Sequence, residues 1–303
     1  MNKKFYILIV CTLGFMPGKA QNFSGNERYY LTELVFNPAS AGSNEELTAI
    51  LSRRKTWASR EGSPTLTMLN VHVRTSDLYN NPRDFIGSRS SRWSAGLGLY
   101  KDQNGLLNTN CIQIPVAYRI KLSSKYTLSF GLAGKFYQSV LSEQDFLATD
   151  PGDPHLNNIS QQAVFLNFNS GLYLSSSKLR IGLSSTNLAP LSRNARNFYN
   201  FEDIRAVYLS CRYKFTLSED HEFEPYLLLR SDHGGLRADL LLKQSLGKNV
   251  GVGFGLASKM GYSFLFSIKV KSYSLGYLLE YSASPLYKYT NGSHMFFLAK
   301  SLW

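Results

Sequence analysis

The chain has few long apolar runs, little charge and few cysteines. Beyond its first twenty residues it has no stretch of the roughly 18 apolar residues that a membrane-spanning helix needs. That absence excludes a helical membrane protein. Charged residues make up 18% of the chain, against roughly 25% in soluble domains, so an ordinary soluble domain is disfavoured as well.

Motifs of enzyme and metal chemistry are also missing. The histidines form no HExxH motif or other close ligand pair, and no G-x-S-x-G nucleophile motif occurs. Cys111 and Cys211 each stand alone in mid-strand, which gives no zinc site or disulfide framework and leaves only a single bridge between them open. We therefore expect no enzymatic activity, no cofactor and no metal.

The first twenty residues have the features of a secretory signal peptide. Lys3 and Lys4 give a positive start, residues 5–16 are apolar, and the small residue Ala20 is suited to signal peptidase. We expect residues 1–20 to be removed. Residues 21–46 would then form an N-terminal periplasmic or plug-like segment, and residues 47–303 the main domain.

The formal charge of +12 would ordinarily suggest a nucleic-acid partner. The basic residues are scattered along the chain, however, and form no tail or basic helix. A secreted chain with this distribution is expected to carry its charge in the interior and at the rims of a barrel, and no nucleic acid is predicted.

What the chain does have is period-two alternation. Phe264, Phe266 and Ile268 alternate with Ser263 and Ser267, which predicts a strand whose aromatic face meets lipid. The predicted strands are 47–57, 64–73, 93–101, 110–121, 126–139, 163–174, 179–187, 206–215, 222–231, 237–246, 250–258, 262–270, 274–282 and 294–302.

These strands predict the fold class. Several reach the roughly 9–11 residues that a tilted strand needs to cross a bilayer, and a sheet in hydrocarbon must close on itself. The sequence therefore predicts an all-β fold, a transmembrane antiparallel β-barrel of about 14 strands in the bacterial outer membrane. Short turns would face the periplasm and the longer segments 141–162, 188–205 and 283–293 the outside. Segment 74–92 is the exception, because it is long and falls on the periplasmic side.

The interior is predicted to carry mixed charge. The inward basic residues are Arg54, Arg119, Arg180, Arg212, Lys214, Arg230, Arg237 and Lys269, and they face Glu222, Glu224, Asp239 and Glu280. Ion pairs among them would hold a narrow lumen closed, whereas unpaired charges would line a pore. Both alternatives stay open at this point.

Two segments outside the strands deserve a hypothesis. Residues 149–154 are typical of turns, since Asp starts turns and Pro fixes φ. The alternatives are a calcium-ordered loop, or catalysis using Asp145, Asp150, Asp153 and His155.

Segment 22–43 is too apolar for a free tail, with Tyr30 and Phe36 among its aromatic residues. We expect it to pack against the periplasmic mouth or to enter the lumen, with a disordered leader as the alternative.

Several short sequence segments, in order along the chain, resemble those of the PorP/SprF family, which are outer-membrane proteins of the type IX secretion system in Bacteroidetes. They are Phe36-Asn37-Pro38-Ala39-Ser40-Ala41-Gly42, Arg53-Arg54-Lys55-Thr56-Trp57, Gly62-Ser63-Pro64-Thr65, Thr149-Asp150-Pro151-Gly152-Asp153-Pro154, Gly182-Leu183-Ser184-Ser185-Thr186-Asn187-Leu188, Tyr281-Ser282-Ala283-Ser284-Pro285-Leu286 and Gly292-Ser293-His294. Met295-Phe296 departs from the family pattern, which has an acidic residue after the histidine. The terminal Trp303 resembles the signal by which outer-membrane barrels are recognised for insertion.

The resemblance implies a non-enzymatic partner of type IX export. It would help to deliver or attach a secreted surface protein with a C-terminal sorting domain, in some members a gliding adhesin. Its other partners would be secretion components in the periplasm and outer membrane, and outer-membrane lipid. The candidate partner or structural residues are Asn37, Pro38, Ala39, Gly42, Trp57, Asp150, Pro151, Asp153, Pro154, His294 and Trp303. A porin or a transporter of small solutes or lipids is the competing interpretation.

Overall fold

The computed structural model describes residues 33–43, 48–60, 62–74, 92–141, 162–189, 191–193, 205–258, 261–281 and 289–301. Two short 3-10 helices precede the strands, η2 (Glu33–Val35) and η3 (Pro38–Ser40). The strands are β1 (Thr48–Lys55), β2 (Thr65–Arg74), β3 (Trp93–Asn104), β4 (Leu107–Lys121), β5 (Thr127–Leu141), β6 (Gln162–Ser175), β7 (Leu179–Thr186), β8 (Leu191–Arg193), β9 (Ala206–Tyr213), β10 (Phe215–Ser218), β11 (His221–Asp232), β12 (Gly235–Leu246), β13 (Val250–Ala257), β14 (Gly261–Val270), β15 (Tyr273–Tyr281) and β16 (Ser293–Ser301).

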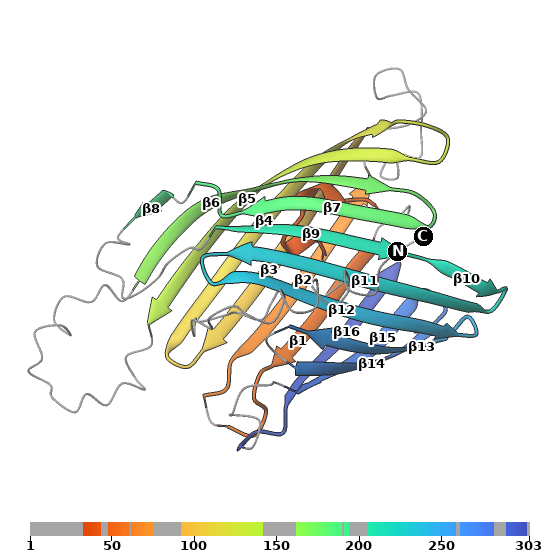
Figure 1. Cartoon of the computed structure of the whole chain (residues 1–303). Helices are drawn as coiled ribbons and strands as arrows, with labels where there is room; N and C mark the ends of the chain where they lie inside the picture. Colours follow the sequence, from red (N-terminus) through yellow and green to blue (C-terminus); the bar gives the residue numbers. More distant parts are fainter. Residues whose placement is uncertain are drawn as a thin grey trace, which may run out of the picture.

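The strands form one antiparallel wall that closes on itself (Figure 1). The first strand, β1, pairs with the last, β16, and at the other side β7 pairs with β9 and β9 with β11. β10 continues β9 after Lys214 and pairs with the same neighbour, β11, so the two occupy one position in the wall. β8 is an extra strand that pairs with β6 off the main path. The result is a closed barrel with fourteen strand positions, as the sequence predicts.

The two ends of the barrel differ. Strands β4 and β5, β6 and β7, β12 and β13, and β14 and β15 are joined by short turns at the end where the wall begins and finishes with Thr48 and Ser301. We call this the short-turn end and the opposite one the loop end. By the asymmetry usual in outer-membrane barrels, the short-turn end faces the periplasm. Residues 75–91, in the long segment that departs from this asymmetry, lie outside the described residues.

Three predicted strand boundaries are wrong. β3 continues to Asn104 and β4 already begins at Leu107. Most of the predicted connection between 101 and 110 is therefore strand, with a tight turn at Gly105, whose φ is 57°. The outward residues near this turn are polar, which hid the alternation. The predicted strand 206–215 breaks at Lys214, whose N–H leaves the ladder to donate to the carbonyl of Lys178 at 2.8 Å. The short β8 was not predicted.

The wall has an apolar outer face. Phe264 and Phe266 are 48% and 47% exposed, whereas Leu265 between them is 4% exposed. Ile268 is also exposed, so the predicted lipid-facing set is confirmed. Among the described residues, no helix has the length and hydropathy to cross a membrane. This outer face is what a barrel wall in hydrocarbon requires.

An arginine in this face tests the assignment. Phe266 lies in the middle of β14 beside Val252 and Tyr277, so Phe266→Arg should lower the free energy of unfolding in lipid by about 2–4 kcal/mol. Ser267→Arg, which places the cation on the inner face, should cost less. Reversible denaturant unfolding in lipid vesicles gives both values, and equal losses would contradict the assignment.

Candidate functional site in the barrel interior

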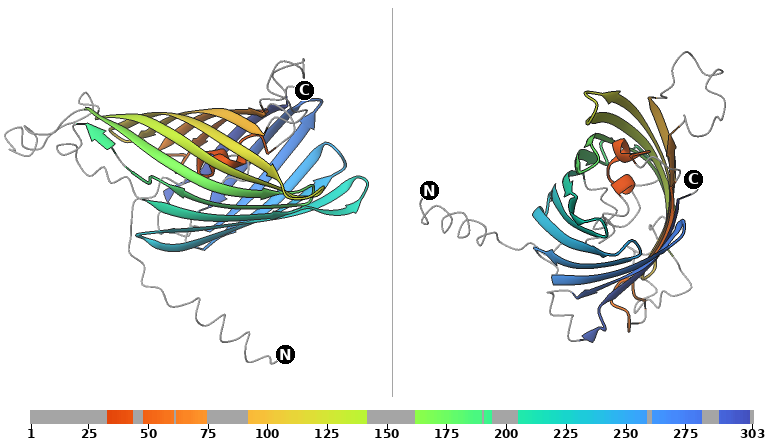
Figure 2. Two further views of the ribbon diagram at one scale, coloured as in Figure 1. Left: turned by 90° about the horizontal axis from the view of Figure 1, so that it is seen from above. Right: turned by 90° about the vertical axis from the view of Figure 1, so that its right-hand side faces the viewer.

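A segment that precedes the first strand lies inside the barrel. Residues 33–43 form η2 and η3, and η3 packs against β4, β5, β6 and β7. Figure 2, seen along the barrel, shows the two helical turns within the ring of strands. We call residues 33–43 the plug.

The plug owes its shape to Asn37. Its Oδ1 accepts a hydrogen bond of 3.0 Å from the N–H of Ala39, which caps η3. Pro38 follows at the first helical position, where its fixed φ suits the turn. The hydroxyl of Ser40 donates to the carbonyl of Asn37 at 2.8 Å. A local Asn-Pro-Ala-Ser sequence therefore builds a rigid turn from its own side chains.

This turn sits directly on the wall, at places where the wall has no side chains. A Cβ at Gly131 would lie 2.2 Å from the nitrogen of Ala39, and one at Gly171 would lie 2.1 Å from Oδ1 of Asn37. The Nδ2 of Asn37 donates to the carbonyl of Leu172 at 3.1 Å. Sequence reasoning missed both glycines, although a glycine within a strand can mark a close backbone approach.

Wall side chains satisfy the polar backbone of the plug. Nε2 of Gln113 donates to the carbonyl of Leu34 at 2.9 Å, and Nη2 of Arg119 donates to the carbonyl of Ala41 at 3.0 Å. These backbone groups have left water, and each would cost free energy if it had no partner. The inward Arg119 predicted from the sequence thus serves the plug.

Gly42, near the end of the plug, is held from both sides. Its N–H donates to Nδ1 of His72 at 3.1 Å, and its carbonyl accepts from Nε of Arg74 at 3.0 Å. Its φ is +61°, and a Cβ there would lie 2.7 Å from the hydroxyl oxygen of Ser94. Both the backbone conformation and the available space therefore require glycine.

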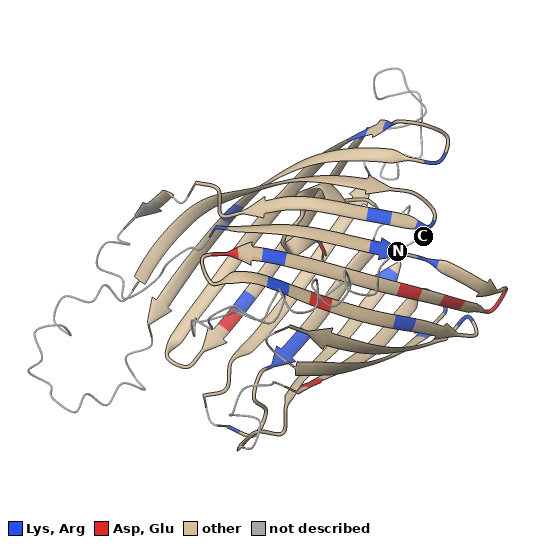
Figure 3. Ribbon diagram, viewed as in Figure 1, with Lys and Arg blue, Asp and Glu red and all other residues tan. Residues whose placement is uncertain are grey.

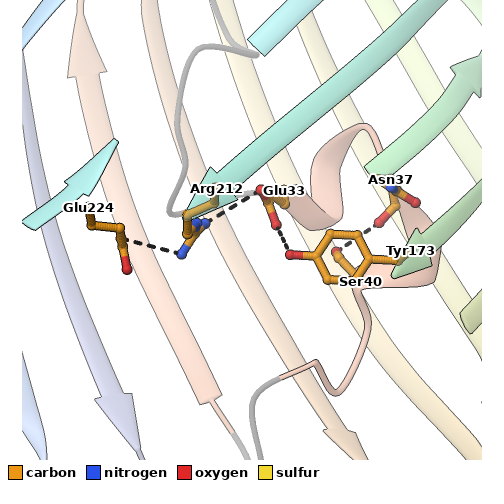
Figure 4. A network of polar contacts seen from close by, with 6 residues as sticks. All are labelled: Glu33, Asn37, Ser40, Tyr173, Arg212 and Glu224. Carbon is orange, nitrogen blue, oxygen red and sulfur yellow. Dashed lines mark hydrogen bonds and ion pairs between the residues drawn. The ribbon is translucent and has the colours of Figure 1, made fainter. Parts of the chain in front are cut away.

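A charged network ties the beginning of the plug to the wall (Figure 4). Glu33 is buried; its Oε1 lies 3.5 Å from Nη2 of Arg212, and its Oε2 accepts a 2.5 Å hydrogen bond from the hydroxyl of Tyr173. Arg212 also lies 3.8 Å from Glu224. The sequence predicted that Arg212 faces acidic residues, but it did not indicate Glu33, which belongs to no strand.

Other interior charges also pair. Figure 3 shows basic and acidic residues interleaved on β11 and β12. The further pairs are Arg54 with Glu280 at 2.8 Å, Lys214 with Glu222 at 2.7 Å, and Arg230 with Asp232 at 2.9 Å. Each of these pairs joins residues of one strand or of strands close together in the wall, so they neutralise charge along the wall, whereas the pair of Glu33 with Arg212 reaches from the wall to the plug.

An apolar layer crosses the interior at the level of Phe36. The ring of Phe36 stacks on that of Tyr208, with centroids 4.9 Å apart. The buried side chains that join it come from widely separated strands: Leu66, Met68, Ala206, Tyr208, Tyr226, Leu228, Leu265, Leu278, Met295 and Phe297. These side chains come from β2, β9, β11 and β14–β16, and Phe36 joins them from the plug, so wall and plug meet in one apolar layer at this level.

Below this layer, toward the short-turn end, the interior holds a cavity of about 400 Å³. Its lining includes Glu33 and Ser43 of the plug, and Lys248 and Asn249 of the β12–β13 turn. The cavity therefore lies between the plug and the periplasmic mouth. It is a recess under the plug, separated from the loop end by the apolar layer.

The predicted site residues separate into groups. Asn37, Pro38, Ala39 and Gly42 lie together in the plug. Trp57 and His294 lie at the loop end, on the paired strands β1 and β16 and the turn beyond. Asp150, Pro151, Asp153, Pro154 and Trp303 lie outside the described residues, as do Asp145, His155 and the expected signal peptide.

At the loop end, the β1–β2 turn is joined to the first residue of β16 and to the residue before it. The N–H of Trp57 donates to the hydroxyl of Ser293 at 3.3 Å, and that of Ala58 to the carbonyl of Gly292 at 2.8 Å. Trp57 has φ +54°, a strained conformation for a bulky residue. His294 faces outward, with its Nδ1 2.5 Å from the hydroxyl of Tyr277. We call residues 57–60 and 289–293 the rim.

The described residues hold neither a metal cluster nor a disulfide. No group of three or more His, Cys, Asp or Glu side chains within the described ranges is placed to hold a metal ion. The two described cysteines, Cys111 on β4 and Cys211 on β9, form no disulfide, since β5, β6 and β7 stand between their strands.

Comparison with known proteins adds structural neighbours and a family. The toluene transporter TodX of Pseudomonas putida matches with 10% identity and a TM-score of 0.46, over 95% of this chain and 94% of that one. The toluene transporter TbuX of Ralstonia pickettii matches with 10% identity and a TM-score of 0.48, over 88% and 92%. The KdgM porin matches with 8% identity and a TM-score of 0.41, over 84% and 99%. Similarity this low does not indicate what this chain does.

No curated protein matches the chain significantly. A family model does, and it spans residues 19–299, which include the plug, the rim and almost all of the wall. The chain belongs to the family of type IX secretion system membrane proteins PorP/SprF.

Proposed function

We propose that this barrel is a closed partner protein of type IX secretion, which helps to export or attach a surface protein bearing a C-terminal sorting domain, such as a gliding adhesin. The observation that carries the proposal is the plug of residues 33–43, held by buried polar contacts on both of its ends. A barrel filled in this way acts through its surfaces and not as a conduit. We also propose that it catalyses no reaction.

The competing proposal, a porin or a transporter of small solutes or lipids, needs a path through the interior. The plug and the apolar layer around Phe36 stand across that path. Removal of the plug would part Glu33 from Arg212 and the carbonyl of Ala41 from Arg119, and breaking a buried ion pair typically costs about 3–5 kcal/mol. That energy argues against a plug that leaves in every transport cycle.

The two ends then suit different partners. The rim at the loop end is ordered by hydrogen bonds between turns far apart in the sequence, and Arg60 adds a bond from its Nε to the carbonyl of Tyr289 at 3.1 Å. Its side chain also lies over the exposed ring of Tyr289. We assign the exported protein to this rim, and the periplasmic machinery to the short-turn end beneath the plug.

A cell-surface assay tests the role in export. In the native host, deletion of this chain should strongly reduce the amount of its sorting-domain protein at the surface, and re-expression should restore it. Surface labelling with protease or antibody measures that amount. If every protein with a sorting domain reaches the surface equally well without the chain, the proposal is wrong.

The plug has a matched test on one strand. Gly131→Ala forces a Cβ against Ala39 and should lower the free energy of unfolding by about 1–3 kcal/mol and reduce export. Gly134→Ala, three residues further along β5, meets nothing within 4 Å and should change neither. Unfolding in lipid vesicles and the surface assay give the two readouts. Normal stability and export in Gly131→Ala would show that the plug does not need this close contact with the wall.

Conductance separates the closed barrel from the porin. The wild-type protein in planar bilayers should show no steady, large openings, because the apolar layer closes its interior. Deletion of residues 33–43 removes Phe36 from that layer and should produce openings. Steady openings of the wild-type protein would support the porin instead.

A further inference from the structure

The outer wall over β1–β5 is hollowed by a groove of about 380 Å³. Its floor is one cross-strand row of apolar residues in register, Leu51, Leu69, Leu99, Ile112 and Phe136. Each pairs with the next on the neighbouring strand, so the row runs straight across five strands. Its apolar residues point to the outer, lipid-facing side of the barrel. Strands β1–β5 are the orange to yellow-green part of the wall in Figure 1.

The next outward row, two residues nearer the loop end, is polar. It consists of Arg53, Thr67, Lys101, Asn110 and Gln138, again paired in register from β1 to β5. Four of these five, all but Arg53, line the groove. Two residues along a strand span about 7 Å, so the polar row stands immediately above the apolar floor.

Positive charge is concentrated at this edge. Arg53 and Lys55 on β1 and Lys101 on β3, the two strands on either side of β2, are exposed and face outward, and none of the three has an ion pair among the described residues. The outward row beyond them is Lys55, Thr65, Gln103, Asn108 and Val140. Neither row contains a carboxylate, so nothing within them offsets the three cations.

We propose that this groove binds an acyl lipid with an anionic phosphate headgroup. The acyl chain lies along the apolar floor, and the phosphate oxygens accept hydrogen bonds from Arg53, Lys55 and Lys101, which are charge-assisted and therefore strong. The hydroxyl of Thr67 and the amides of Asn110 and Gln138 bind the neutral oxygens beside the phosphate. The groove faces the outer leaflet, because its polar row is near the β3–β4 turn at Gly105.

The alternative is that the cations only reach into the general headgroup layer, as long basic side chains do at any membrane interface. That alternative explains exposed lysines, but it predicts no hollow beneath them and no row of short, hydrogen-bonding side chains between them. A defined site, in contrast, selects one lipid, and its binding depends on both the apolar floor and the basic residues beside it.

The headgroup is tested by native mass spectrometry of the full-length barrel released from detergent with added lipid. Dioleoyl phosphatidylglycerol should bind more tightly than dioleoyl phosphatidylcholine, which has the same chains and no net charge. Lys101→Gln and Arg53→Gln should each weaken phosphatidylglycerol binding roughly fivefold. Lys121→Gln, an exposed cation at the other end of β4, is the control and should have no effect. Equal binding of the two lipids, or equal effects of Lys101→Gln and Lys121→Gln, would overturn the proposal.

The floor is tested by filling it. Leu99→Trp should block the groove and abolish the preference for phosphatidylglycerol, whereas Leu97→Trp, equally outward on β3 but outside the groove, should leave it intact. Inorganic phosphate distinguishes a lipid site from a simple anion site. If millimolar phosphate displaces the lipid fully and Leu99→Trp binds as the wild type does, the site recognises phosphate alone and the assignment to a lipid is wrong.

Discussion

The structure depends on one constraint: a strand edge in hydrocarbon has no water with which to form hydrogen bonds, so the sheet must close. Pairing of β1 with β16 meets it. Closure with fourteen strand positions then creates a second demand, because an eight-stranded barrel is about the size that its own side chains can fill. The wider interior here is filled by the plug, by the apolar layer around Phe36 and by the ion pairs above and below that layer.

Wall side chains hold the plug by hydrogen bonds to its backbone. Asn37 and Pro38 fix a turn that presents carbonyls and N–H groups outward, and Gln113, Arg119 and His72 bind those groups. Because the wall offers glycine where the turn approaches, main chain lies against main chain. The close approach of the two backbones explains why small residues and a proline occur in the plug, although it fills much of the barrel interior.

The wall was predictable from the sequence because its signal is local. Alternation at Phe264, Leu265 and Phe266 reports directly which side faces lipid. The same rule failed between residues 101 and 110, where the outward residues, such as Lys101 and Asn110, are polar like the inward ones, so that the sequence does not alternate. The plug's partners were not predictable, since Glu33 meets Arg212 only after the chain has passed through eight intervening strands. Gly131 and Gly171 lie against the plug, and a contact of this kind is not visible in the sequence around them.

The place of the plug in the ring has a consequence for folding. Its second helical turn, η3, packs on β4 to β7, whereas the seam between β1 and β16 lies elsewhere in the wall. The plug can therefore settle on its four strands while the sheet is still open. Pairing of β1 with β16 then completes the barrel around a plug already in place, and the segment never has to enter a finished barrel.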